Sequence, residues 1–361
     1  MTELGWPLSV PVLSDGIVTL RAHTPGDVDR MLQMAQDPDM VRWTTVPTPH
    51  TREMSEEFAL EVIPAGWNDG SNRCWAIEFE GRYAGNVDIR GTDVLANIGY
   101  ALHPDCRGHG VMTAAVRLAV DHAFVEAGKE VVQWEAHVGN EASLRVAHAC
   151  GFRLHDVVPD TLLERGTIHD AWYGTIRFGD TPMPRTRWLD STLTVAGAVL
   201  RPPHEGDLQR WAEAESDPIT RHWSNEPEQT VDDIRGALHR GIWRTARGDR
   251  AVWTIADPGD DRFLGQVILA AVTGTPEIGY FIHPDARGRG LAGAAVRAAS
   301  DHALADDGIG LRRLELFVAD GNEASLAVAR AAGFRQYGRK SLAEPLGDGT
   351  YADLVAFERL R

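Results

Sequence analysis

Residues 98–124 read IGYALHPDCRGHGVMTAAVRLAVDHAF, and residues 278–304 read IGYFIHPDARGRGLAGAAVRAASDHAL, so one pattern occurs twice in the chain. Arg107 and Arg287 hold the same place in the two copies, 287 − 107 = 180 residues apart. Each copy predicts a short apolar strand, a His-Pro-Asp turn, an Arg-Gly-x-Gly loop and an Ala- and Val-rich helix. A glycine loop that opens a helix presents free backbone N–H groups, and this arrangement suits a phosphate or pyrophosphate group.

The repeat extends through both halves of the chain. Each half begins with a strand that carries an arginine, Arg21 or Arg201, and each contains an Asn-Glu-Ala-Ser helix start beyond the glycine loop. We therefore predict two domains, residues 1–180 and 181–361, joined by the Pro-rich polar segment 179–190. The order of elements in each half is β, α, α, β, β, β, α, β, α, β, β. This order predicts an α/β fold, a mixed and mostly antiparallel sheet flanked by helices.

Composition limits the classes of partner. The net charge of −16 disfavours a nucleic-acid partner, because phosphate binding requires a cationic surface. Residues 1–180 hold 14 Lys and Arg against 26 Asp and Glu, 14 − 26 = −12, which leaves −4 for the rest. An acidic first half would attract a cationic acceptor. The same negative charge is also explained by ordinary solubility. No apolar run or basic leader indicates a membrane or secreted protein, so we expect a cytoplasmic protein without a membrane partner.

The three cysteines, Cys74, Cys106 and Cys150, have no CxxC spacing. Ala286 and Ala332 stand at the positions that match the last two in the second half. The pattern therefore predicts neither a disulfide framework nor a metal site.

The surroundings of the glycine loops identify the family that they resemble. The chain has no GxGxxG motif followed by an acidic strand end and no GxxxxGK[ST] motif. An IGY strand, a His-Pro turn and an Asn-Glu-Ala-Ser helix start about 30 residues later together resemble the GNAT acetyltransferases. The resemblance is greatest to the RimJ/RimL-type branch, the ribosomal-protein N-terminal acetyltransferases, and it covers nearly all of each half.

The resemblance implies that acetyl-CoA binds to both loops, with its pyrophosphate on backbone N–H groups of residues 108–113 and 288–293. The family's Arg/Gln-x-x-Gly-x-Gly/Ala motif is matched fully in the second half, whereas Met112 departs from it in the first. The residues expected to bind the cofactor are Tyr100, Arg107, Gly108, His109, Gly110, Val111, Met112, Thr113 and Asn140 in the first half, and Tyr280, Arg287, Gly288, Arg289, Gly290, Leu291, Ala292, Gly293 and Asn322 in the second.

Catalytic and acceptor residues also follow from the resemblance. Ser143 and Ser325 match the position of the acid that protonates the leaving thiolate, although a serine in the first turn of a helix can also simply cap it. Glu135 and Glu315 match a glutamate that holds a water for deprotonation of the amine. Glu277 is a second candidate base, and its counterpart in the first half is Asn97.

The aromatic residues Trp43 and Trp223, again 223 − 43 = 180 residues apart, fall in the segment that lines the acceptor site of relatives. An aromatic ring there could stack on a cationic amine or could belong to the core.

These observations favour an acetyl-CoA-dependent N-acetyltransferase that acts on a primary amine, either a protein N-terminus or a small molecule. The alternative is an acyl-CoA-binding sensor or scaffold in which one or both domains have no catalytic activity. The internal repeat further predicts that the two halves pair as a pseudo-dimer within one chain.

Overall fold

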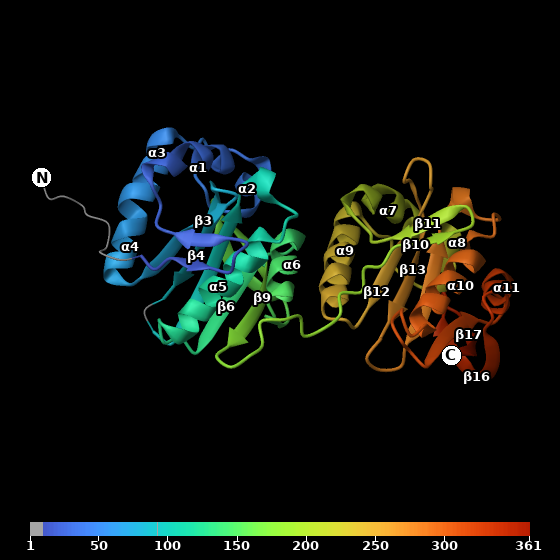
Figure 1. Ribbon diagram of the computed structural model, residues 1–361. Helices are drawn as coiled ribbons and strands as arrows, with labels where there is room; N and C mark the ends of the chain where they lie inside the picture. Colours follow the sequence, from blue (N-terminus) through green and yellow to red (C-terminus); the bar gives the residue numbers. More distant parts are fainter. Residues whose placement is uncertain (1–9, 92) are drawn as a thin grey trace, which may run out of the picture. The chain divides into compact units, whose positions relative to one another are not determined.

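The computed structural model describes residues 10–91 and 93–361, and the chain divides into two compact units between Arg185 and Thr186. This division falls inside the Pro-rich segment 179–190. Each unit contains its own sheet, covered by helices on both faces (Figure 1). No helix among the described residues is both long and apolar enough to cross a membrane.

The first unit contains a mixed sheet in the order β1-β2-β3-β4-β5-β6-β9-β7, with β8 paired to β9. Its strands are β1 (Leu13–Ser14), β2 (Thr19–Arg21), β3 (Asn72–Phe79), β4 (Arg82–Arg90), β5 (Leu95–Leu102), β6 (Val131–His137), β7 (Arg153–Leu154), β8 (Val158–Glu164) and β9 (Thr167–Arg177). Its helices are α1 (Val28–Ala35), α2 (Pro38–Trp43), α3 (Arg52–Glu57), α4 (Ile63–Asp69), α5 (Val111–Val125) and α6 (Glu141–Ala149), and a π-helical turn at Phe58–Val62 joins α3 to α4.

The second unit repeats this plan in the order β10-β11-β12-β13-β14-β15-β17-β16. Its strands are β10 (Leu193–Val195), β11 (Ala198–Arg201), β12 (Ala251–Ala256), β13 (Phe263–Ala270), β14 (Glu277–Ile282), β15 (Arg313–Ala319), β16 (Arg335–Pro345) and β17 (Tyr351–Leu360). Its helices are α7 (Leu208–Ser216), α8 (Pro218–Ser224), α9 (Val231–Ala246), α10 (Leu291–Leu304) and α11 (Glu323–Ala331). The predicted fold class, two tandem mixed sheets flanked by helices, is confirmed.

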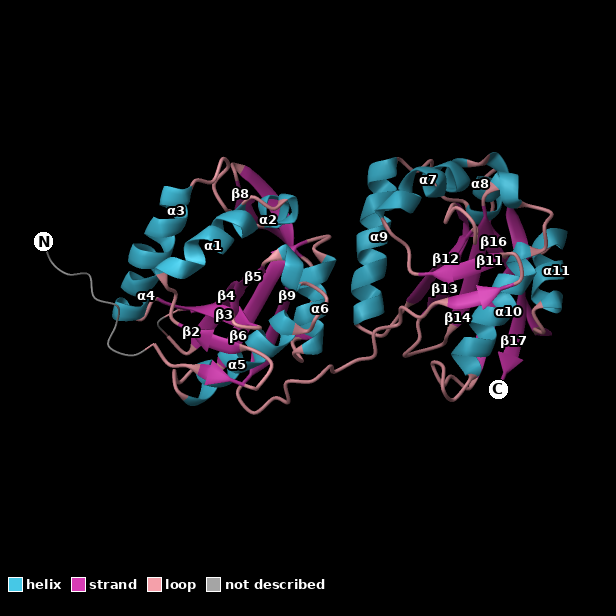
Figure 2. Cartoon of the chain, turned by 45° about the horizontal axis from the view of Figure 1, so that its top comes forward, coloured by secondary structure: helices cyan, strands magenta, loops and turns pink. Residues whose placement is uncertain are grey.

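The two faces of each sheet are covered by different helices, because side chains alternate along a strand. In the second unit, Val267 and Leu316 belong to a core cluster with α10 and α11, whereas Phe263 belongs to a separate cluster with α7 and α9. In the first unit, α1 packs on the face that presents Ala76 and Tyr83. Figure 2 shows α1 and α5 on opposite sides of the first sheet.

One parallel strand pair in each sheet separates soon after it begins. Strand β5 pairs with β6 only over Leu95–Asn97 and Val131–Gln133, and β14 pairs with β15 at Glu277 and Glu315. On its other side, β5 stays paired with β4 along residues 97–102. Beyond the short parallel contact, no strand within residues 10–91 and 93–361 pairs with this edge of β5 or of β14.

Gly85 and Gly265 stand at matching β-bulges, next to register shifts in the β3–β4 and β12–β13 pairs. Their φ angles are 156° and 155°, in the region that favours glycine. A Cβ on Gly85 would meet the Ala101 carbonyl oxygen at 2.2 Å, so only glycine lets β4 pass this close to β5.

We expect Gly85→Ala to lower the free energy of unfolding of the full chain by about 1–3 kcal/mol, because it adds both backbone strain and a clash with a carbonyl. Chemical denaturation monitored by tryptophan fluorescence would measure the loss. Gly279→Ala is the matched control, since a Cβ there has no atom within 4 Å. Equal effects of the two substitutions would contradict this account.

Candidate active site

The glycine loops have open backbone at a helix start. Gly108 and Gly110 have φ angles of 79° and 74°, and a Cβ on either would have nothing within 4 Å. Gly110 caps α5 without any side-chain hydrogen bond, and the first helical bond runs from Ala114 N–H to its carbonyl at 3.1 Å. The N–H groups that precede Ala114, in the first turn of α5, therefore point out of the helix end, where the positive end of the helix dipole also lies.

The second loop repeats this geometry. Gly288 and Gly290 both have φ of 74°, again with open space at the Cβ positions. Gly290 caps α10, and Ala294 N–H donates to its carbonyl at 3.2 Å. Each unit therefore presents the same open loop geometry at the start of a helix.

The loop arginines contact protein carboxylates. Arg107 lies 2.5 Å from Asp37 and 2.9 Å from Asp39, and Arg287 lies 2.6 Å from Asp217. Asp37 and Asp217 are also the N-caps of α2 and α8. Each arginine therefore ties its glycine loop to the short helix that follows α1 or α7.

The predicted serines and tyrosines meet in both units. Ser143 Oγ donates to the Tyr100 hydroxyl and accepts from Trp134 Nε1, both at 3.0 Å. In the second unit the Tyr280 hydroxyl donates to Ser325 Oγ at 2.8 Å. Burial raises the pKa of Tyr100 well above its ordinary value, so its phenol stays protonated near neutral pH. Each tyrosine thus connects the strand before the glycine loop to helix α6 or α11.

The predicted asparagines cap these helices. Asn140 Oδ1 accepts the Ser143 N–H at 3.2 Å, and Asn322 Oδ1 accepts the Ser325 N–H at 3.1 Å. Both side chains therefore fix the first turn that presents the serine.

The candidate bases Glu135 and Glu315 do not occupy equivalent positions. Strand pairing sets Gln133 opposite Asn97 and Glu315 opposite Glu277, so Gln133 is the counterpart of Glu315. Glu135, two residues further along, corresponds to Phe317. Aligning the two halves by sequence did not reveal this shift. The segment from the loop arginine to the paired strand residue is two residues longer in the second unit, 315 − 287 = 28 against 133 − 107 = 26.

The surroundings of these carboxylates also differ. Glu135 is exposed, whereas Glu315 is buried, lies 2.6 Å from Arg313 and accepts from the Tyr337 hydroxyl at 2.7 Å. Burial, followed by the negative charge of Glu315, raises the pKa of Glu277. Glu277 therefore has the character of a proton acceptor with a raised pKa, while Glu315 is already occupied by protein donors.

The predicted aromatics lie near the ends of α2 and α8. The Arg42 guanidinium lies 4.4 Å from the centre of the Trp43 ring. The Trp223 and His222 rings are edge-on to each other, with their centres 4.6 Å apart. Trp43 directly precedes Thr44, which lines a cavity in the first unit.

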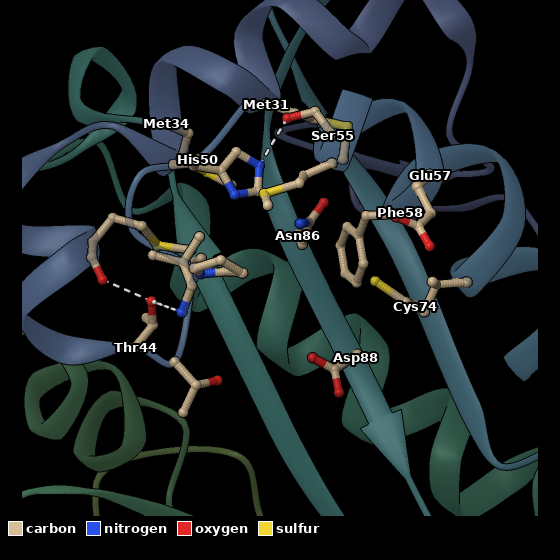
Figure 3. A pocket seen from close by; sticks show the side chains of 18 of the residues that line it. Met31, Met34, Thr44, His50, Ser55, Glu57, Phe58, Cys74, Asn86 and Asp88 are labelled. Atoms are coloured by element: carbon tan, nitrogen blue, oxygen red, sulfur yellow. Dashed lines mark hydrogen bonds between the residues drawn. The ribbon is translucent and has the colours of Figure 1, made fainter. Parts of the chain in front are cut away.

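This cavity, of about 580 Å³, lies between the sheet and the segments from α1 to the π-helical turn Phe58–Val62 (Figure 3). Methionines supply much of its wall, and Asp88 lies on its floor, in β4. Burial raises the pKa of Asp88, while the nearby Arg90 lowers it. The sequence analysis did not identify Asp88 as a candidate site residue. The sequence pattern that could have identified it is a charged residue within the alternating strand NVDIR, residues 86–90. The residue that matches Asp88 in the second half is Ile268.

A second group that the sequence comparison missed is His137, Glu164 and His169, whose ligand atoms lie within 4.8 Å of one another. Two imidazoles and a carboxylate are a donor set that suits zinc. However, Arg165 already forms an ion pair with Glu164, and His137 Nε2 lies 3.1 Å from the same carboxylate. The Glu164 carboxylate therefore already has two protein partners, Arg165 and His137.

Comparison with known proteins identifies the family. The model of the acetyltransferase (GNAT) domain matches residues 18–153 and 198–335. The candidate ribosomal N-acetyltransferase YdaF of Bacillus subtilis (strain 168) is 27% identical over 177 residues, which are 43% of this chain and 88% of YdaF. The candidate N-acetyltransferase YjcK of the same organism is 35% identical over 82 residues, 23% of this chain and 45% of YjcK.

Among solved structures, Mycobacterium smegmatis RimJ in complex with CoA-disulfide is similar at 23% identity and a TM-score of 0.43, over 48% of this chain and 88% of RimJ. The family model covers most of both halves. The chain therefore belongs to the GNAT acetyltransferase family, as two tandem domains.

Proposed function

We propose that this protein is an N-acetyltransferase that uses acetyl-CoA as its acyl donor and a primary amine as its acceptor. The observation that carries the proposal is the repeated combination of a glycine loop that starts a helix without a side-chain cap and a strand edge to which no described strand pairs. Both features occur in each unit, so we extend acetyl-CoA binding to both.

The residues present fit this cosubstrate. The space at Gly108 and Gly110 leaves the backbone N–H groups of residues 108–113 accessible, and a pyrophosphate would meet both these donors and the helix dipole. The free edge of β5 beyond Asn97 supplies backbone groups for the extended pantetheine arm. Residues 288–293 and β14 would do the same in the second unit.

Bound there, acetyl-CoA supplies a thioester carbonyl to a neutral amine. A carbon–nitrogen bond forms, the carbon–sulfur bond breaks, and the amine proton is lost to a base. The Ser143 hydroxyl is our candidate proton donor to the departing thiolate, because Tyr100 and Trp134 fix its oxygen in place. Ser325 is the corresponding group in the second unit.

The candidate bases differ between units. In the first, exposed Glu135 is free to hold a water molecule, and in the second, Glu277 and Glu315 stand side by side across two strands. This difference supports the alternative that one unit binds acyl-CoA without turning it over.

Calorimetric titration with acetyl-CoA tests the cosubstrate claim. We expect two molecules bound per full-length chain, and about one for Gly110→Val or Gly290→Val, because a side chain at φ near 74° distorts the cradle and covers its N–H groups. Gly16→Val is the control for strain alone, since Gly16 has φ of 87° in a different turn. The absence of any binding by the native chain would defeat the proposal.

The role of Ser143 is tested by Ser143→Ala. We expect kcat for thiol release from acetyl-CoA to fall about 100-fold or more, because a positioned proton donor is lost, while acetyl-CoA affinity stays within about twofold. A thiol-reactive chromophore and calorimetry would measure the two quantities. Turnover within about twofold of the native chain, also after Ser325→Ala is added, would show that the Ser143 hydroxyl only joins Tyr100 to Trp134.

A further inference from the structure

The cavity of the first unit has the size and chemistry of a small-molecule or peptide-terminus site. Its volume of about 580 Å³ lies within the range typical of ligand pockets. Met31, Met34, Met40 and Met54 line it together with Phe58. Methionine side chains adapt their shape, so such a wall accepts apolar groups of varied outline.

Charged groups in this cavity are acidic. Its lining contains Asp88 and Glu57, and it contains no Lys or Arg. The one histidine on the wall, His50, donates to or accepts from Ser55 at 3.0 Å, and burial lowers its pKa, which keeps it neutral near pH 7. The cavity therefore favours a ligand that combines a cation with an apolar body.

Asp88 is the carboxylate best placed for that cation. Its side chain is 19% exposed and stands opposite Gly99 on β5, next to the strand residue Tyr100. Arg90 Nε lies 2.9 Å from Asp88 Oδ2, but not in hydrogen-bond geometry. This oxygen is buried and has no hydrogen-bond donor within residues 10–91 and 93–361. A buried carboxylate oxygen without a donor is costly unless a ligand supplies one.

The second unit has larger apolar side chains at matching positions. By strand register, Ile268 opposes Gly279 just as Asp88 opposes Gly99, so Ile268 replaces the carboxylate. Phe281 stands where the first unit has Ala101, and Trp211 stands where it has Met31.

These aromatic rings pack together with Phe263. Trp211 and Phe263 are stacked, with ring centres 6.4 Å apart, and Phe263 and Phe281 are 6.2 Å apart. Trp211 and Phe263 belong to one buried cluster that Ile234 and Leu238 of α9 complete, and Phe281 packs against it. Bulky apolar groups thus stand at positions that match two cavity-lining residues of the first unit, Met31 and Ala101.

We propose that the first unit alone receives the acceptor, a primary amine carried on an apolar group, and that the Asp88 carboxylate binds its ammonium group. This rests on the proposed N-acetyltransferase function and specifies its substrate class. The second unit, which retains the glycine loop but not this cavity, binds acyl-CoA without taking an amine at this position.

The test uses the full chain, saturating acetyl-CoA and 2-phenylethylamine as the probe, with spermidine and glutamate as a polycationic and an acidic amine. We expect 2-phenylethylamine to be the best acceptor. Asp88→Asn should raise its KM at least tenfold and leave acetyl-CoA affinity unchanged, because the ammonium loses its counter-charge. Ile268→Asn, which introduces the same residue at the matched position of the second unit, should leave KM and kcat within twofold.

Ala101→Phe provides a second variant that does not depend on removing a charge. It introduces the second unit's residue into the cavity, and we expect amine turnover to fall at least tenfold while calorimetry still finds two acetyl-CoA sites. The inference would be overturned if Asp88→Asn left KM unchanged and Ala101→Phe retained turnover. A preference for spermidine or glutamate over 2-phenylethylamine would also overturn it.

The outcomes separate this inference from the proposed function. A native chain that neither binds acetyl-CoA nor releases thiol with any amine fails as an acetyltransferase altogether. A native chain that acetylates amines with no dependence on Asp88 and Ala101 keeps the proposed function and loses only the acceptor site.

Discussion

The site in each unit depends on two parallel strands that separate after a very short contact. Strands β5 and β6 pair over three residues, Leu95–Asn97, before β5 continues without a neighbour on that side. Backbone N–H and C=O groups on such an edge must find partners in water or in a ligand. The Tyr100–Ser143 hydrogen bond connects β5 to the helix that follows β6, so this edge remains defined although no strand covers it. Tyr280 and Ser325 form the same connection in the second unit.

The glycine loop is held at the end of this edge by ion pairs. Arg107 and Arg287 bond to the aspartates that cap α2 and α8, and Arg30 and Arg210 reach Asp105 and Asp285 in the turn before the loop, at 2.7 and 2.8 Å. The loop itself can therefore consist of glycines with positive φ, because its flanking residues supply the rigidity. In the first unit, the same bonds couple the loop to α1 and α2, which line the cavity.

The two units share the loop and differ where an acceptor would enter. Asp88, Ala101 and Met31 in the first unit correspond to Ile268, Phe281 and Trp211 in the second. Backbone contacts to a phosphate use atoms that every residue has, so the loop tolerates divergence around it. A cavity depends on side-chain volume, and a few larger residues are enough to fill it.

The sequence by itself determined the repeat, the fold class and the two glycine loops, because each depends on residues close together in the chain. These are the alternating apolar residues, the His-Pro-Asp turn, and the glycines before an Ala-rich helix. It also named Ser143 and Tyr100 separately, although their hydrogen bond joins residues 43 positions apart. The tertiary structure alone decided that Glu135 and Glu315 are not counterparts, because strand register is fixed by pairing with β5 and β14 and not by spacing from the loop. It also decided that Asp88 is half-buried on a cavity floor, since the segments between residues 31 and 62 pack over a distant strand.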